Sequence, residues 1–489
     1  MMAQSRLPGR FTALDAIFID IESATAPMHI GSVSMYDGPV SRARLMKHVT
    51  SRLDQLPRYR QVMAPTPLNL GYPTWRPDPD FDIGRHVFEL RAPKHCTDAR
   101  LRAIAARVLG TMLDRGKPLW ELHVVNGLEG GRSAVIAKIH HCLADGISGV
   151  ELGTVIHDHT PKPPAPVRSP RLRTRPRAEA AHPILDALWD NAAEELKRWT
   201  EAERGAAKFV ESLSLASAPG TWKEVFGIVR TFSLPIDRMP FNVHRLSGKK
   251  RIAFAEYSFA EVRAIRAALG GTVNDVMLTL VGTAVRRYLQ AHKLRPARKT
   301  LRIMVPMSLR REDERGRMGN RVSMLPVQIP LGFEGPVEMF DYVREHTARL
   351  KDAHVADALY GLLRALQIGP MTQAAVGRLT RLPAVSALLT TVSGFPSINT
   401  VVTNVPGPQV PLYLLGRRME SYYPFLPCAP EVSATFGILS YNQKLAVTIV
   451  ADAAAMPDTE RMRALLDESF VELRTAAAIA ERPHVHLHA

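Results

Sequence analysis

The order of apolar and polar residues predicts alternating strands and helices in the first third of the chain. Strand-like alternation, with an apolar side chain at every second position, occurs at 29–36, 121–126 and 133–139. Apolar residues spaced three and four apart, as on one face of a helix, occur at 41–56 and 99–113. The glycine-containing stretch 127–131 indicates a turn between the last two strands.

The second half of the chain shows the same mixture again. Strands are predicted at 251–258, 301–307, 321–329, 399–405, 433–440 and 444–451, and helices at 260–269, from about 272 to 292, 337–354 and 458–481. Gly270-Gly271 separates the first two helices, and either Thr272 or Asn274 is placed to cap the second. The pattern therefore predicts an α/β (α+β sandwich) fold in two units, with a ligand site in a tunnel or cleft between them.

A basic, proline-rich stretch divides the two halves. Six Lys or Arg, six prolines and no acidic residue lie between 161 and 177. Prolines lack the backbone donor that helices and sheets require, so this stretch is expected to be a linker. Helical spacing returns at 182–216. We predict a first domain over 1–160, a linker with crossover helices over 161–240, and a second domain over 241–489.

The composition is that of a globular protein with an excess of basic residues. Of 489 residues, 46% are hydrophobic and 22% charged, and the formal net charge is +16. Such a charge favours anionic partners, among them a phospholipid surface or a phosphorylated cofactor. No nucleic-acid recognition motif is present, and no basic run is interleaved with aromatic residues, so we expect no nucleic-acid partner.

Cysteine content and the N-terminus bear on the compartment. Three cysteines without a paired spacing indicate neither a disulfide framework nor a zinc site, so no metal is expected. Asp15, Asp20 and Glu22 interrupt the apolar core that a signal peptide would need. No apolar run approaches the ~20 residues of a membrane span. We expect a cytoplasmic protein with peripheral contact to the inner membrane face or to lipid droplets.

The stretch with the clearest chemical meaning is His140-His141-Cys142-Leu143-Ala144-Asp145-Gly146. It lies between the predicted strand 133–139 and the helical pattern 147–157, where a turn presents side chains to a cleft. A histidine there can take a proton from a hydroxyl, because its free pKa is about 6.5. A lone histidine is more often a satisfied core residue, but a doublet in a turn favours chemistry.

Several further motifs, taken in order with this one, give a family resemblance. The chain resembles the bacterial wax ester synthase/acyl-CoA:diacylglycerol acyltransferases, within the chloramphenicol-acetyltransferase-like superfamily, over almost its whole length. Besides the histidine motif, the matching residues are Leu14-Asp15-Ala16-Ile17-Phe18, Pro27-Met28-His29-Ile30-Gly31, Pro118-Leu119-Trp120-Glu121-Leu122-His123, Val273-Asn274-Asp275, Pro306-Met307-Ser308-Leu309-Arg310, Gly319-Asn320, Asn404-Val405-Pro406-Gly407-Pro408, Pro411 and Gly416. One departure is Pro427-Cys428-Ala429-Pro430-Glu431, where a glycine-containing turn is expected; it puts acceptor selectivity in doubt.

The resemblance implies transfer of an acyl group from acyl-CoA, as co-substrate, to diacylglycerol or a fatty alcohol. No permanently bound cofactor is implied. His141 would be the general base. His140, adjacent on the strand, points to the opposite face and is expected to support the motif through a buried hydrogen bond. Asp145 would hold the turn by pairing with an arginine, for which Arg310 is a hypothesis, and Gly146 would supply a backbone conformation that side chains resist.

Two further residues have alternative roles. By resemblance Asn274 would donate to the oxyanion of the tetrahedral intermediate, and the alternative is a simple helix cap. Cys142 opens a covalent acyl-cysteine route, which we rank below direct transfer because alternation places it on the side of His140. The Leu- and Ala-rich residues 356–391 would line an acyl tunnel, touch a membrane surface, or form ordinary core.

Other functions remain open to the sequence. One alternative is a condensation-type or polyketide-ester acyltransferase that uses a carrier-bound donor, although the chain contains no carrier segment. Another is a non-catalytic lipid-binding relative, which the intact motif argues against. No Gly-rich phosphate loop is present, so coenzyme A contacts are not assigned. Acyl chain length, preferred acceptor and oligomeric state are not indicated by the sequence.

Overall fold

The structure is a computed structural model, and it describes residue 9 and residues 11–65, 72–143, 153, 155–162, 236–308, 322–352 and 398–477. Several predictions concern residues outside this part of the chain. They are the helical pattern at 182–216, the apolar region 356–391, and the roles of Asp145, Gly146 and Arg310.

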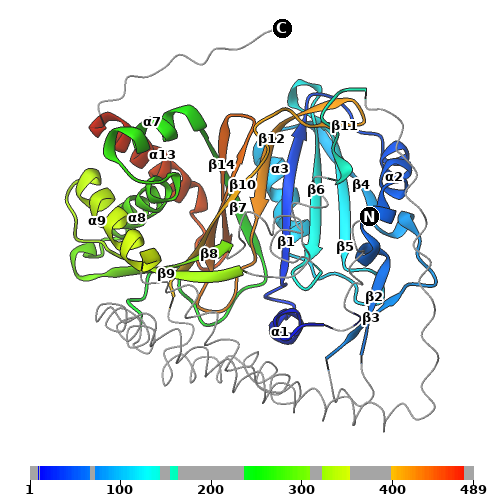
Figure 1. The fold of residues 1–489 in the computed structure, drawn as a ribbon, viewed down its shortest axis with the longest axis horizontal. Coiled ribbons are helices and arrows are strands. Elements are labelled where there is room, and N and C mark those ends of the chain that lie inside the picture. Colours follow the sequence, from blue (N-terminus) through cyan, green and yellow to red (C-terminus); the bar gives the residue numbers. More distant parts are fainter. Residues whose placement is uncertain are drawn as a thin grey trace.

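Two six-stranded mixed sheets stand side by side, each with helices (Figure 1). The first has the order β11-β12-β1-β6-β5-β4, and the second β7-β14-β13-β10-β8-β9. Strands of the first sheet are β1 (His29–Tyr36), β4 (Val87–Cys96), β5 (Trp120–Leu128), β6 (Ser133–His140), β11 (Tyr413–Leu414) and β12 (Arg417–Phe425). Strands of the second are β7 (Lys250–Ser258), β8 (Thr300–Ser308), β9 (Val322–Pro330), β10 (Thr400–Pro406), β13 (Ala434–Tyr441) and β14 (Lys444–Asp452).

The α-helices largely follow the predicted periodicities. They are α1 (Ala13–Ile21), α2 (Arg42–Thr50), α3 (Asp98–Leu109), α7 (Phe259–Leu269), α8 (Val273–Ala291), α9 (Pro336–Asp352) and α13 (Thr459–Ala476). Short 3-10 helices lie at Leu53–Gln55, Pro57–Arg60, Ile83–Arg85, Glu129–Gly131 and Pro296–Arg298, and a small hairpin pairs β2 (Gln61–Ala64) with β3 (Thr74–Pro77). The predicted α/β architecture of two units is confirmed, whereas a tunnel between them stays a prediction.

The two sheets do not divide at the predicted boundary near residue 241. β11 and β12 come from the C-terminal part of the chain but belong to the first sheet, where β12 pairs antiparallel with β1 from Gly31↔Phe425 onward. In this way the first sheet closes the edge of β1 with a strand from the other half. Residues 413–425 therefore lie in the first sheet although they fall within the predicted second domain, and the domain boundaries stay a prediction.

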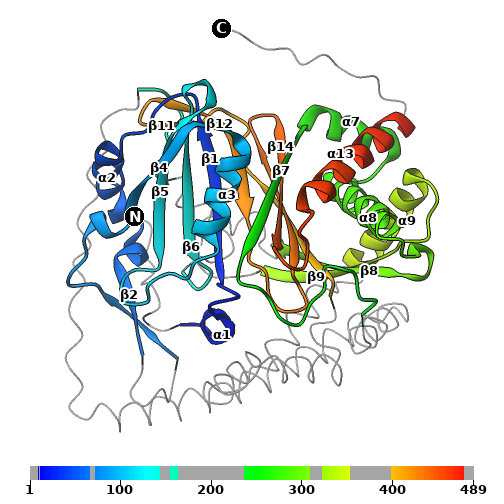
Figure 2. The same cartoon turned by 180° about the vertical axis from the view of Figure 1, so that it is seen from behind.

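A shared apolar cluster joins the two halves. It combines Leu101 and Ala105 of α3 with Leu246, Ile252 and Val450 from the second half, all of them buried. α3 packs against β7, and Figure 2 shows it between the first sheet and that strand. The two halves thus bury apolar area against each other and form one packed body.

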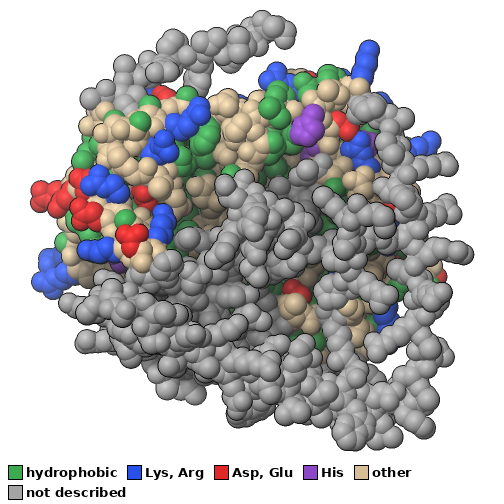
Figure 3. Space-filling model, viewed as in Figure 1, with side chains coloured by type: hydrophobic (Ala, Val, Ile, Leu, Met, Phe, Trp, Pro, Cys, Tyr) green, Lys and Arg blue, Asp and Glu red, His purple; other side chains and the backbone are tan. Residues whose placement is uncertain are grey.

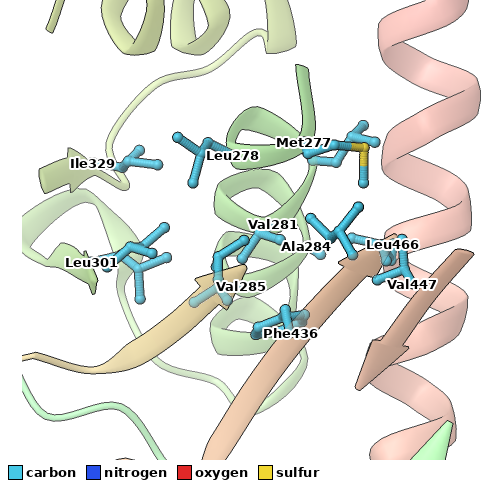
Figure 4. Packing of buried hydrophobic residues seen from close by; sticks show 14 of the residues in the cluster. Met277, Leu278, Val281, Ala284, Val285, Leu301, Ile329, Phe436, Val447 and Leu466 are labelled. Carbon is cyan, nitrogen blue, oxygen red and sulfur yellow. The ribbon is translucent and has the colours of Figure 1, made fainter. Parts of the chain in front are cut away.

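α8 is the central helix of the second half. Its side chains pack on all sides against β8, β9, β13, β14 and α13, as Figure 4 shows for Met277, Val281 and Val285. The hydroxyl of Thr272 accepts from the backbone N–H of Asp275, and the Asp275 carboxylate accepts in return from the Thr272 N–H, which makes Thr272 the N-cap. Of the two predicted caps, Thr272 is right and Asn274 is wrong.

Among the described residues, no single helix is long and apolar enough to cross a membrane. α7 and α8 pass that test only as a pair, with a bend of 96° between them. On the face seen in Figure 3, basic and acidic side chains lie side by side over the helices of the second half.

Candidate active site

Strand pairing fixes the backbone of the histidine motif. β6 lies between β1 and β5, and His140 is the register partner of His29. The pairing continues one residue past the strand, because the His141 N–H donates to the carbonyl of Met28 at 2.9 Å. His141 therefore leaves the sheet from a fixed position, at the end where β1 begins and against Phe18 of α1. Figure 1 shows α1 at that end of the first sheet.

The imidazole of His141 lies against an aromatic ring and is held neutral. Its ring is stacked on that of Phe18, with centroids 3.8 Å apart and planes 11° apart. Burial lowers the pKa of His141 to about 4, with its own backbone carbonyl acting in the opposite direction and the charge of His140 lowering it further. Nδ1 is buried without a hydrogen-bond partner among the described residues, while the residue as a whole remains partly exposed. The exposure of the residue therefore does not come from Nδ1.

His140 is fully buried, and its ring lies beside Cys142 and Glu22. Its Nδ1 accepts from the backbone N–H of Cys142 at 3.1 Å, so Nε2 is the ring nitrogen that carries a proton. Nε2 lies 3.3 Å from Oε1 of Glu22. This is the buried, supporting position predicted for His140, and its effect on turnover stays a prediction.

Glu22 is a functional residue that the sequence reasoning missed. Its carboxylate is buried, accepts from the Met28 N–H at 3.1 Å and from the Arg115 guanidinium at 2.8 Å, and faces His140. Burial would raise the pKa of Glu22, but the hydrogen bond and charge of His140, with Arg115 and Met28, lower it to about 2. Glu22 was considered only as an argument against a signal peptide. The signal in the sequence that could have indicated Glu22 is an acidic residue at the end of a largely apolar helical stretch.

His29 completes this group from the neighbouring strand. Its Nε2 donates to the carbonyl of Thr111 at 2.8 Å, which leaves Nδ1 unprotonated and 3.8 Å from Oε1 of Glu22. Burial, together with the charges of Lys138 and His140, lowers the pKa of His29 to about 3. Glu22 is therefore a buried carboxylate that faces His29, His140 and Arg115.

A second buried charge group continues along the same face of the sheet. Lys138 precedes His140 by two residues on β6, and Glu121 is its register partner on β5. The Glu121 carboxylate accepts from Lys117 at 3.0 Å, pairs with His123 at 3.0 Å, and lies 3.6 Å from the Lys138 ammonium. Burial would raise the pKa of Glu121, but these three partners lower it to about 2.

The surroundings of Cys142 favour the protonated thiol over the nucleophilic thiolate. Its Sγ lies 3.0 Å from Nδ1 of His140, on the side predicted by alternation. Burial raises the pKa of the Cys142 thiol well above its usual range, and the charges of Asp15 and Glu22 raise it further. Since the thiolate is the reactive form, these surroundings argue against a covalent route.

His157 and Asp158, which follow the histidine motif in the sequence, are anchored to the first domain. The Tyr36 hydroxyl and Nε2 of His157 are 2.6 Å apart, and the Arg52 guanidinium donates to Asp158 at 2.5 Å. Asp158 also forms a backbone bridge with Tyr413. The chain that follows Asp145 and Gly146 is therefore anchored from His157 onward, by residues that the sequence reasoning did not single out.

Asn274 lies in the first turn of α8, half-buried. The carboxylate of the neighbouring Asp275 already has two partners. It accepts from Thr272 and from the Thr347 hydroxyl of α9 at 2.7 Å. A cap no longer explains Asn274, and its role as an oxyanion donor stays a prediction.

The unusual turn at 427–431 has a defined conformation. Glu431 has φ +67°, the left-handed region that favours glycine, which accounts for the glycine expected there. Its buried carboxylate faces His244 and Arg238, and its backbone carbonyl accepts from the Asn242 side chain at 2.5 Å. At this departure from the family pattern, neighbouring side chains therefore hold Glu431 in the left-handed conformation.

Metal chemistry has no obvious location in the part of the chain that is described. No group of three or more His, Cys, Asp or Glu side chains there is arranged to hold a metal ion.

Comparison with known proteins identifies the family. The model of the wax ester synthase/diacylglycerol acyltransferase catalytic domain matches residues 11–277, and that of the WS/DGAT C-terminal domain matches 318–474. A probable diacylglycerol O-acyltransferase of Mycobacterium tuberculosis is 28% identical over 480 residues, covering 97% of both chains. A putative diacylglycerol O-acyltransferase of Mycobacterium bovis is 29% identical over 478 residues, covering 95% of this chain and 98% of the relative.

Solved structures show the same fold. The wax ester synthase/diacylglycerol acyltransferase from Marinobacter aquaeolei VT8 superposes with a TM-score of 0.66 at 20% identity, covering 96% of this chain and 100% of that one. The first condensation domain of the calcium-dependent antibiotic synthetase gives 0.53 at 14% identity, covering 97% of each. With both family models matched, and the histidine doublet where β6 ends, the chain belongs to the wax ester synthase/diacylglycerol acyltransferase family and is an O-acyltransferase.

Proposed function

We propose that this enzyme transfers a long-chain acyl group directly from acyl-CoA to the hydroxyl of diacylglycerol, of a fatty alcohol, or of both. The products are triacylglycerol or wax ester, and free coenzyme A. The names of the mycobacterial and Marinobacter relatives support both acceptor classes. The observation that carries the proposal is His141, neutral and partly exposed at the end of β6.

The reaction needs one base and no covalent intermediate. Nε2 of His141 takes the hydroxyl proton as the alcohol oxygen attacks the thioester carbonyl. The tetrahedral intermediate collapses, the C–S bond breaks, and the imidazolium returns the proton to the leaving sulfur. A ring whose pKa is about 4 is a weak base, but it is unprotonated at any neutral pH and returns the proton readily.

Asn274 is proposed to stabilise the developing oxyanion. It lies in the first turn of α8, where backbone N–H groups and the helix dipole favour negative charge. Asn274→Ala should lower turnover by about 10²-fold, the usual worth of one oxyanion donor. Unchanged turnover would remove this role.

Two further parts of the proposal concern donor and surface. Acyl-CoA is the co-substrate, with no permanently bound cofactor, and the net charge of +16 supports attraction to its phosphates and to an anionic membrane or lipid-droplet surface. Flotation of the protein with vesicles that contain or lack anionic lipid tests the surface contact. Equal recovery with both vesicles would contradict it.

Purified enzyme supplied with long-chain acyl-CoA and a panel of acceptors tests the reaction itself. We expect acceptor-dependent release of free thiol, and ester products whose amount matches it. His141→Ala should abolish both, while His292→Ala, at the far end of α8, should not. Transfer only from a carrier-bound donor would favour the condensation-type alternative. Lipid binding without any ester would favour a non-catalytic relative.

A further inference from the structure

α1 is fixed in place by contacts at both of its ends. Just before its start, the backbone N–H of Phe11 donates to the carbonyl of Pro73 at 3.0 Å, and Thr12 and Asp15 cap the first turn. Near its end, Arg115 donates to the Ile19 carbonyl at 3.1 Å and to the carboxylate of Glu22 at 2.8 Å. None of these contacts involves the ring of His141, so the helix has a position independent of it.

This helix presents one side chain to each histidine of the motif. Phe18 lies on the ring of His141, and Glu22, four residues later, faces His140. Residues four apart lie on the same side of a helix, so a single docked face serves both. The sheet fixes the backbone of His141, but the ring can still turn about its side-chain bonds.

We infer that Phe18 is a positioning residue, whose ring lies flat on the imidazole of His141 and fixes the plane in which it meets the acceptor. The inference rests on the proposed role of His141 as base. Phe18 has no polar atom, so it cannot exchange protons or compete for Nε2. A parallel contact with centroids at 3.8 Å restricts rotation of the imidazole out of its plane.

The flat shape of the side chain is what the inference requires. Leucine at position 18 would keep an apolar side chain over the imidazole but has no flat face. Tyrosine keeps the flat aromatic face. Ile17, the next residue on α1, is 38% exposed and gives a matched control on the same helix.

Steady-state kinetics of Phe18→Leu, Phe18→Tyr and Ile17→Ala therefore test the inference. We expect Phe18→Leu to lose about tenfold in kcat with KM changed less than about threefold, because geometry is lost and not substrate binding. Phe18→Tyr and Ile17→Ala should stay within about threefold of the parent. Full kcat in Phe18→Leu, or equal loss in Phe18→Tyr, would overturn the inference.

A second readout does not depend on activity. In protein labelled at histidine ring carbons, the ring protons of His141, assigned through His141→Ala, should show the upfield shift of a stacked partner. Phe18→Leu should lose the shift and Phe18→Tyr keep it; a shift that is the same in all three proteins would contradict the stacking. If His141→Ala is inactive while Phe18→Leu is fully active, only this inference fails. If His141→Ala is fully active, the proposed function fails first.

Discussion

The two neighbouring histidines of the motif differ because the chain leaves the sheet between them. His140 is the last residue of β6 and is buried beside Glu22, whereas His141 is partly exposed against Phe18. Burial of an imidazole disfavours its charged form, since no water remains to solvate it. The same strand end thus supplies one ring held beside a buried carboxylate and one ring that is proposed to act as the base.

The neutral state of His141 has a consequence for the pH dependence of catalysis. A base must be unprotonated to act, and protonation of a group with a pKa of about 4 occurs only well below neutral pH. We expect kcat/KM to show no loss near pH 6.5, the ordinary histidine value, as the pH is lowered from 8 to about 5. A pH–rate profile, with folding checked at each pH by circular dichroism, measures this. A loss of activity centred near pH 6.5 would contradict the lowered pKa of a buried His141.

Replacement of Glu22 tests the support under the motif. Glu22→Gln removes the charge that Arg115 and His140 face, and loss of a charged hydrogen-bond partner in a buried site costs about 1–3 kcal/mol. The melting temperature should fall and turnover with it. Asp98→Asn, which breaks an exposed contact with Arg132, is the control and should change neither. Equal melting temperatures for the two variants would count against a structural role of Glu22.

Cys142 provides the test of direct transfer. Because its thiol pKa is raised by burial, Cys142→Ala should keep kcat within about threefold of the parent. Mass spectrometry of the parent during turnover should show no added acyl group. An acyl-enzyme in the parent, together with an inactive variant, would establish the covalent route instead.

Among the elements, the start of α8 brings together a structural residue, Thr272, and a residue proposed to act in the chemistry, Asn274. Thr272 caps the helix, so Thr272→Ala should lower the free energy of unfolding by about 1 kcal/mol and leave turnover nearly unchanged. Asn274→Ala should do the reverse. Thermal melting and kcat, measured on both variants, decide between these assignments. A lower melting temperature with full turnover in Asn274→Ala would leave Asn274 without a chemical role.

Elements with regular patterning were predictable, and those without it were not. β1, β13 and α8 are rich in apolar residues with strand-like or helical spacing, and the sequence places each of them within one or two residues. β12 was missed because charged residues and Pro424 interrupt its alternation, and its pairing with β1 is far in sequence. β4 contains Pro93 and lies at a sheet edge, where patterning is weak.

The same distinction holds for the site. The histidine doublet was found because its residues are contiguous in the chain. Glu22 and Arg115 were not found, and Phe18 entered only as part of the motif at 14–18, because all three reach the site only through the folding of α1 and of the segment after α3. Local periodicity carries no information on which distant helix covers a strand end.

At the scale of the whole molecule, buried histidines should make the fold sensitive to acid. The pKa of His29 is lowered to about 3, and those of His141, His157 and His346 to about 4, mainly by burial. Between these values and 6.5 the unfolded chain binds more protons than the folded one, so stability decreases as the pH falls. We expect a lower melting temperature at pH 5 than at pH 7.5. Equal or higher stability at pH 5 would contradict the burial of these rings.

The two halves share strands and an apolar cluster, so they should unfold together. β12 crosses into the first sheet, and residues of both halves pack around α3. This shared packing holds the strand end that carries His141 at a fixed distance from the second half. Catalysis thus depends on the whole body, although the proposed proton transfer belongs to a single ring.

The turnover of His141→Ala under single-turnover conditions, with the melting temperature of the parent retained, tests the central claim most directly. Acyl-CoA and a fatty alcohol are mixed with excess enzyme, and ester formation is followed with time. The account predicts a rate lower by about 10²–10⁴-fold, the usual worth of a general base. Ester formation at the rate of the parent would contradict it.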